Sequence, residues 1–269
     1  MTQYSIDDLI TLMARLRDPR DGCPWDLKQS FASIVPHTLE EAYEVADAIE
    51  REDWSHLKDE LGDLLFQVIF YARLGEETRH FDFAAIVDNL VEKLLRRHPH
   101  VFPAGTLDSR AGDQVRSEAQ IREAWEAIKQ QERDDKARGG VLDDVPVSLP
   151  ALSRAAKLQK RASRVGFDWN DPLLVLDKIE EEIAELREAI GRGAEAEIVD
   201  ELGDLIFAQV NLARHLGADP EVALRGTNAK FVRRFAHIEQ AVVASDRDWD
   251  DFTLAELDAL WNEAKAKGL

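Results

Sequence analysis

The chain has 269 residues, which favours two domains over one. Acidic side chains outnumber basic ones by 53 to 34, and the formal charge is −19. This surplus disfavours binding to nucleic acid or to an anionic membrane, because both need clustered cations. One cysteine excludes an internal disulfide and a thiolate zinc site. The opening MTQYSIDDLI lacks the cations of a secretory signal, and no run approaches the roughly 20 apolar residues of a membrane span. We therefore expect a cytoplasmic protein.

Apolar residues recur at helical spacing along the chain, and alternating strand patterns are absent. Thr38 followed by Glu41 is typical of a capping box, and Asp171 before Pro172 is typical of a helix start. The fold class is therefore predicted as all-α. Ten helices are expected near 5–17, 38–51, 54–78, 82–97, 114–137, 149–164, 172–190, 194–216, 218–243 and 253–267.

Two segments are typical of connectors. Residues 103–113 are small and polar, and residues 132–147 combine a charge run, a Gly pair and a Pro. The predicted organisation is an N-terminal helical domain over 1–131, a linker over 132–147, and a C-terminal helical domain over 148–269.

The two halves repeat each other. The segments EKLLRRHPHVF and AWEAIK of the first half align, in the same order, with AKFVRRFAHIE and LWNEAK of the second. The spacing between acids also agrees, since 19 positions separate Glu41 from Glu60 and Glu182 from Glu201. We interpret the chain as a tandem duplication. Each half carries an EExxE…ExxD pattern, whose members are Glu40, Glu41, Glu44, Glu60 and Asp63 in the first half and Glu181, Glu182, Glu185, Glu201 and Asp204 in the second.

The spacing predicts where these acids lie. Acids three positions apart share one helical face, and a short connection makes consecutive helices antiparallel. In such a hairpin, the residue numbers of any two facing residues add up to the same total, and half of that total is the residue at the turn. These totals place the turns at Glu52 and Gly193. Four carboxylates are therefore expected to meet in each half, and we call each set an acidic quartet.

Four clustered carboxylates require relief from their mutual repulsion, which is about 4 kcal/mol for two charges 4 Å apart at an effective dielectric constant of 20. An all-oxygen ligand set suits Mg²⁺, and Mn²⁺ is the expected substitute. Lys230 and Arg234 lie four positions apart on a later helix, where they could neutralise phosphate charge. A di-iron bundle would require Glu-x-x-His, which neither quartet contains. Solvated acidic helix faces are the common alternative, but two copies at the same spacing beside apolar runs favour a site.

Several segments together resemble the MazG family of nucleoside triphosphate pyrophosphohydrolases, within a wider all-α group with the same acidic motif. They are GCPWD, TLEEAYEV, DELGDLLFQV, RRHPHVF, VGFDW, EEEIAEL, DELGDLIFA and NAKFVRRF. The resemblance implies Mg²⁺-dependent cleavage of NTPs and dNTPs to the monophosphate and pyrophosphate by a homodimer.

By resemblance, the C-terminal copy is the hydrolytic one, with Glu182, Glu185, Glu201 and Asp204 as metal ligands. The N-terminal copy keeps Glu41, Glu44, Glu60 and Asp63, and nothing in these residues explains why it should be silent. The resemblance also implies that the nucleotide contacts Lys178, Glu181, Lys230, Arg233, Arg234, Trp261 and Lys265. Glu197 stands where some relatives place a lysine, so a phosphate contact at that position is in doubt.

The expected mechanism is attack of a metal-activated water on a phosphorus, with Glu182 or Glu181 accepting the proton and Glu201 essential for turnover. Two alternatives remain open. The protein could be a nucleotide sensor or scaffold that binds a regulatory protein partner without turnover, or only the N-terminal copy could be active. The sequence leaves open the base preference, the number of metals and the dimer geometry.

Overall fold

The computed structural model describes residues 3–111, 117–136, 140–143, 145–245 and 247–269. These residues form α-helices and two short 3-10 helices, and no strand occurs among them. The all-α prediction is confirmed. Parts of the two predicted connectors, and the predicted start of the fifth helix near 114, lie outside the described residues.

The chain divides into two compact units, residues 1–136 and 137–269. Unit 1 contains α1 (Ile6–Leu16), α2 (Phe31–Glu50), α3 (Trp54–Glu77), α4 (Phe83–Arg97) and α5 (Glu118–Lys136). Unit 2 contains α6 (Ala151–Arg164), α7 (Pro172–Arg192), α8 (Glu195–His215), α9 (Pro220–Ala244) and α10 (Leu254–Ala266). The predicted linker over 132–147 stays a prediction, and α5 extends through its first residues.

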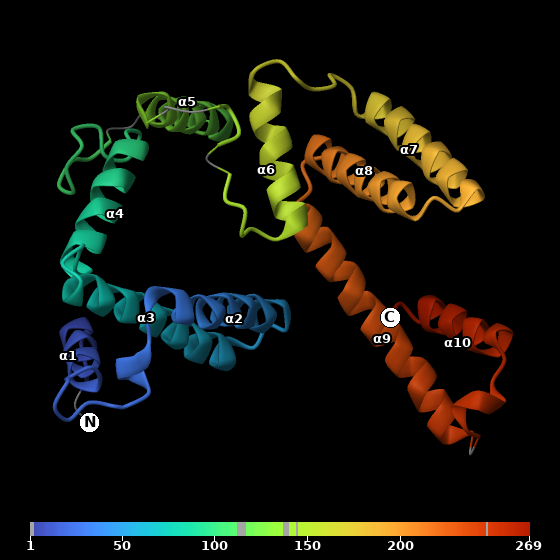
Figure 1. Cartoon of the computed structure of the whole chain (residues 1–269), viewed down its shortest axis with the longest axis horizontal. Coiled ribbons are helices and arrows are strands. Elements are labelled where there is room, and N and C mark those ends of the chain that lie inside the picture. The colour runs from blue at the N-terminus through green and yellow to red at the C-terminus, as the bar shows by residue number, and fades with distance from the viewer. Residues whose placement is uncertain (1–2, 112–116, 137–139, 144, 246) are drawn as a thin grey trace. The chain divides into compact units, whose positions relative to one another are not determined.

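Each unit is organised around one helical hairpin, α2–α3 in unit 1 and α7–α8 in unit 2 (Figure 1). The two turns lie where the constant sums centre them. Glu52 and Gly193 both adopt the left-handed conformation, with φ of 55° and 67°. Glycine reaches this conformation without strain, whereas a residue with a side chain rarely adopts it. The hairpin turn of unit 1 therefore carries a local strain that the turn of unit 2 avoids.

The start of α2 differs from the prediction. The helix begins at Phe31, where Ser30 and Ser33 form the capping box, and Pro36 lies inside the helix. Thr38 is not a cap, because its hydroxyl donates to the Ile34 carbonyl one turn earlier and lies 2.9 Å from the Tyr71 hydroxyl. The expected start rested on the Thr38–Glu41 spacing, which can also occur inside a helix that begins earlier. By contrast, the predicted cap at Asp171, followed by Pro172 in the first turn of α7, is confirmed.

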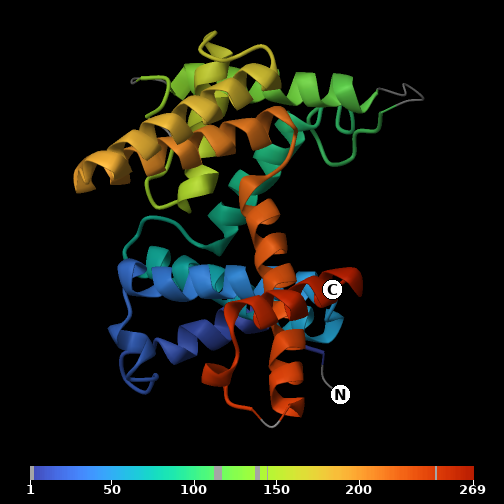
Figure 2. The same ribbon diagram turned by 90° about the vertical axis from the view of Figure 1, so that its right-hand side faces the viewer.

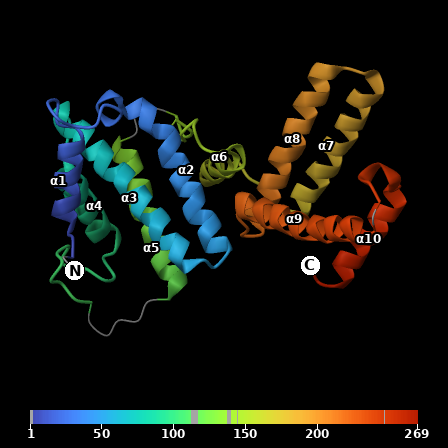
Figure 3. The same ribbon diagram turned by 90° about the horizontal axis from the view of Figure 1, so that it is seen from below.

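The core of unit 1 lies between α1, α2 and α3. Met13, Ile34, Ile69, Phe70 and Leu74 are buried there. In unit 2, α6 packs on α8, and α9 runs across one end of the hairpin (Figure 3). The last helix, α10, lies alongside the far part of α9 (Figure 2). In the described part of the chain, no helix is long and apolar enough to span a membrane.

Candidate metal and nucleotide site

The two hairpins bring acids from facing helices together. In unit 2, one carboxylate oxygen each from Glu182 on α7 and from Glu201 and Asp204 on α8 lie within 4.8 Å of one another. We call these three residues the acidic group of unit 2. A cation placed among the three oxygens would contact ligands of the kind that Mg²⁺ prefers.

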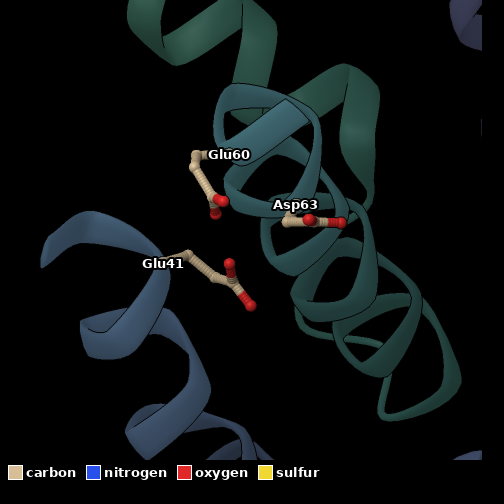
Figure 4. Close-up of side chains that lie close together, drawn as sticks. All are labelled: Glu41, Glu60 and Asp63. Carbon is tan, nitrogen blue, oxygen red and sulfur yellow. The ribbon is translucent and has the colours of Figure 1, made fainter. Parts of the chain in front are cut away.

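Unit 1 holds the same arrangement. Glu41 on α2 points its carboxylate toward α3, which carries Glu60 and Asp63 (Figure 4). Oxygens of these three residues also lie within 4.8 Å of one another, and they form the acidic group of unit 1. The duplication of the pattern in sequence is thus a duplication in space.

The fourth acid of each predicted quartet lies next to the group of three. In unit 1, burial and then the charge of Glu44 raise the pKa of Glu60. In unit 2, burial and then the charge of Glu185 raise the pKa of Glu201. Each predicted acidic quartet therefore consists of three acids that lie close together and a fourth acid beside them. The assignment of all four acids as metal ligands stays a prediction.

The electrostatics of both groups favour binding of a cation or a proton. Burial, and then the neighbouring carboxylates, raises the pKa values of Glu41, Glu60 and Glu201 above the usual range for glutamate. A bound divalent ion would remove this cost, because opposite charge favours the ionised form of each acid.

Lys178 connects two of the predicted site acids in unit 2. Its Nζ donates to Glu181 Oε1 and lies 2.8 Å from both Glu181 Oε1 and Glu182 Oε1. These two carboxylates raise the pKa of the lysine. Glu182 is only 4% exposed, and its second oxygen, Oε2, is buried with no hydrogen-bond partner among the described residues. A buried carboxylate oxygen without a partner is costly, and it fits the role of a metal ligand.

The other predicted nucleotide contacts lie on α9 and α10. Arg234 lies with its guanidinium carbon 5.4 Å from the ring centre of Trp261, and its Nε donates to the carbonyl of Leu269 at 2.9 Å. Lys230 is half-buried, and Arg233 and Lys265 are exposed. Figure 1 shows α9 leaving the end of the hairpin, with α10 near its far part. The role of these residues stays a prediction.

Glu197, where a lysine contact was in doubt, forms an ion pair with Arg192 across the hairpin turn at 2.6 Å. In unit 1, the basic residue Arg97 is engaged by Glu132, whose Oε2 lies 2.5 Å from its Nη2. Arg97 and Arg96 lower the pKa of Glu132 to about 2. Arg97 therefore shares the Glu132 carboxylate with Arg96 inside unit 1.

Sequence reasoning missed residues that line a cavity beside the acidic group of unit 2, among them Gln159, Asn211 and Arg214. A signal for one of them was present. Adding 141 to a residue number in the first hairpin gives its counterpart in the second, as from Glu41 to Glu182. By this register Asn211 corresponds to Phe70, a change of chemistry at a position close to matching acids.

Comparison with known proteins agrees with this architecture. The MazG nucleotide pyrophosphohydrolase domain matches the chain twice, at residues 29–102 and 170–238. The chain is 49% identical to the nucleoside triphosphate pyrophosphohydrolase of Escherichia coli K12, over 97% of both chains. It is 41% identical to the nucleoside triphosphate pyrophosphohydrolase/pyrophosphatase MazG of Thermotoga maritima, over 96% of this chain and 95% of that one.

Among solved structures, a mazG-related protein from Thermotoga maritima is 25% identical, with a TM-score of 0.38, covering 46% of this chain and 99% of that one. Each of the two segments that match the MazG domain, 29–102 and 170–238, contains one of the two hairpins with its acids. From the domain matches and the two full-length relatives, the chain belongs to the MazG family of nucleotide pyrophosphohydrolases.

Proposed function

We propose that the protein hydrolyses nucleoside triphosphates, NTPs and dNTPs, to the monophosphate and pyrophosphate, with Mg²⁺ held by the acidic group of unit 2. The observation that carries this proposal is the convergence of Glu182, Glu201 and Asp204, with Glu182 Oε2 buried and unpartnered among the described residues. Full-length relatives that carry the name nucleoside triphosphate pyrophosphohydrolase support the reaction class.

The residues present fit a hard divalent cation. Glu182, Glu201 and Asp204 would hold it, with Glu185 beside them. A bound ion would polarise phosphate oxygens and make a coordinated water more acidic. Mg²⁺ is the ion expected for all-oxygen ligands with phosphate, and Mn²⁺ could replace it.

The side chains around the acidic group supply the remaining chemistry. Glu181 lies next to Glu182 along α7, remains half-exposed, and is oriented by its hydrogen bond from Lys178. We assign Glu181 the role of accepting a proton from the attacking water, since a carboxylate outside the ligand set is free to do so. Lys178 places positive charge beside the acids, where it would stabilise charge on the phosphate oxygens. Arg234 and Trp261, with Lys230, would bind the nucleotide from α9 and α10.

We also propose that the active form is a homodimer. The second hairpin exposes a row of large apolar side chains on α8, which includes Leu202 and Ile206. Apolar surface of this kind is normally covered in an assembly. A second copy of the chain presents the same row, and a twofold axis would pair the two rows.

The test is a substrate panel. The full chain is incubated with each NTP and dNTP, with Mg²⁺ and without it, and the products are separated by chromatography. Monophosphate and pyrophosphate in equal amounts, only with the metal, would support the proposal. Tight nucleotide binding without any product would favour a nucleotide-sensing role instead.

A further inference from the structure

A cavity of about 540 Å³ opens beside the acidic group of unit 2. Glu182 and Asp204 form part of its wall, and Phe167, Trp169 and Phe207 form an aromatic part. Its volume lies in the range of small-molecule binding sites, which are typically apolar with a few placed polar groups. A molecule that fills this cavity therefore touches the predicted metal ligands at one end.

Two buried carboxamides contribute neutral polar groups to the cavity, whose lining also includes Asp168, Lys178 and Arg214. Gln159 is 8% exposed and donates from Nε2 to the Phe207 carbonyl at 2.8 Å. Its Oε1 is buried and has no hydrogen-bond partner among the described residues. An orphaned acceptor in a cavity wall carries a desolvation cost unless a ligand or water donates to it. Gln159 thus offers one unused acceptor.

Asn211 supplies the complementary donor. It is 3% exposed, and its Oδ1 accepts from Arg214 Nε at 3.1 Å and from Arg214 Nη2 at 2.7 Å. Because a guanidinium has only donors, the carboxamide oxygen must face Arg214, and the Nδ2 group is left to donate elsewhere. Arg214 is itself held by Asp168, at 2.5 Å. The orientation of Asn211 is therefore fixed from behind.

One donor and one acceptor with aromatic rings beside them match the chemistry of a nucleobase. The hydrogen-bonding edge of every base presents donors and acceptors, and proteins bind extruded bases by such hydrogen bonds together with stacking on aromatic side chains. Phe167 is largely exposed and Trp169 is partly exposed. Side chains that stack on a ligand must be accessible before the ligand binds, and both rings meet this condition.

Unit 1 differs at the same position. Phe70, the counterpart of Asn211, is fully buried and packs with Met13 and Ile69 in the core. The Arg17 guanidinium lies 5.3 Å from the centre of its ring. An aromatic side chain thus occupies the position that the carboxamide donor has in unit 2, although the acids of the two units match.

We propose that the cavity of unit 2 binds the base of the nucleotide, with Asn211 Nδ2 and Gln159 Oε1 as its hydrogen-bonding partners, and that Phe70 removes this subsite from unit 1. The inference rests on the proposed function, because it states where the base of the proposed substrate binds. It also gives a physical reason why two copies with the same acids would differ in activity: unit 1 keeps the acids but lacks the carboxamide that the base would contact.

The test uses the full chain with Asn211→Phe, which gives unit 2 the residue of unit 1. Loss of stacking and hydrogen bonding should raise the KM of every NTP by about tenfold to a hundredfold. Inorganic tripolyphosphate has no base, so its inhibition constant should stay within about twofold of the wild-type value, as should the affinity for Mn²⁺ alone. Asn89→Phe, the same change at an exposed position of α4, is the matched control and should leave all three values unchanged.

Asn211→Leu removes the donor with less added volume, and it serves as the second variant if Asn211→Phe fails to fold. Binding of the four nucleoside monophosphates is measured by calorimetry in parallel and should weaken in either variant. An unchanged KM and unchanged monophosphate binding in a folded variant would overturn the inference. Equal losses for tripolyphosphate and Mn²⁺ would also overturn it, because the defect would then lie in the metal site. If the wild-type chain hydrolyses no NTP, the proposed function fails, while the monophosphate titration still decides the cavity.

Discussion

Replacement of Phe70 and of Asn211 by alanine should have unequal effects on stability, although the two residues occupy corresponding positions of the two hairpins. Phe70 is fully buried in the core of unit 1, among Met13, Ile69 and Leu74. Truncation of a buried Phe costs about 3–5 kcal/mol, from lost transfer free energy and the cavity left behind. A domain is stable by about 5–15 kcal/mol, so unit 1 would lose a large share of its stability.

Asn211→Ala should cost less, because Asn211 lines an existing cavity. The substitution removes the hydrogen bonds from Arg214, but this arginine keeps its ion pair with Asp168. We expect a loss of no more than about 2 kcal/mol. Urea denaturation followed by hydrogen exchange of peptides from each unit separates the two effects. Equal costs for the two substitutions would refute the reasoning, since Phe70 would then not fill space that unit 2 leaves open.

Four further outcomes are expected. Mg²⁺ should raise the thermal midpoint of the wild-type chain at pH 8, and it should raise it less as the pH approaches 5. The pKa of Glu201 is raised in the folded state. The metal-free chain should therefore gain stability as the pH falls through that raised pKa, and lose stability as the pH rises through it. Glu201→Gln should raise the metal-free midpoint at pH 8 and reduce the gain from Mg²⁺, and a lowered midpoint would contradict the predicted repulsion. The pKa of Glu132 is held at about 2, so its contribution to stability should be complete above its ordinary pKa of 4.5 and disappear as pH falls toward 2; a stability difference between wild type and Glu132→Gln that does not vary with pH would contradict this. Leu202→Glu with Ile206→Glu should convert the proposed dimer to a monomer in analytical ultracentrifugation, and a sedimentation coefficient equal to that of the wild type would place the interface elsewhere.

The sequence carried most of the hairpin geometry. Helical periodicity determines which side chains share a face, and the constant total of residue numbers determines which residues of the two helices oppose each other. The proximity of Glu41 to Asp63 and of Glu182 to Asp204 could therefore be predicted from the sequence alone. Both turn centres, Glu52 and Gly193, lie where the sums place them. The predicted start of α2 near residue 38 was wrong, because the Thr38–Glu41 spacing lies inside a helix whose capping box is formed by Ser30 and Ser33.

The cavity could not be predicted in the same way. Asn211 and Gln159 stand at positions that periodicity assigns to a buried face, and periodicity cannot distinguish a filled core from a hollow one. Whether space remains depends on the volumes of side chains from several helices. Comparison of the two repeats was the usable signal, since Phe70 opposite Asn211 marks the site where two otherwise similar hairpins diverge.

The measurement that tests the central claim most directly compares Glu201→Gln in unit 2 with Glu60→Gln in unit 1, each in the full chain. Monophosphate and pyrophosphate formed from each NTP with Mg²⁺ are separated by chromatography, and far-UV circular dichroism confirms that both variants keep their helices. Glu201→Gln should abolish product formation, while Glu60→Gln should retain the wild-type rate. Full activity of Glu201→Gln, or loss of activity in Glu60→Gln alone, would contradict the assignment of hydrolysis to the acidic group of unit 2.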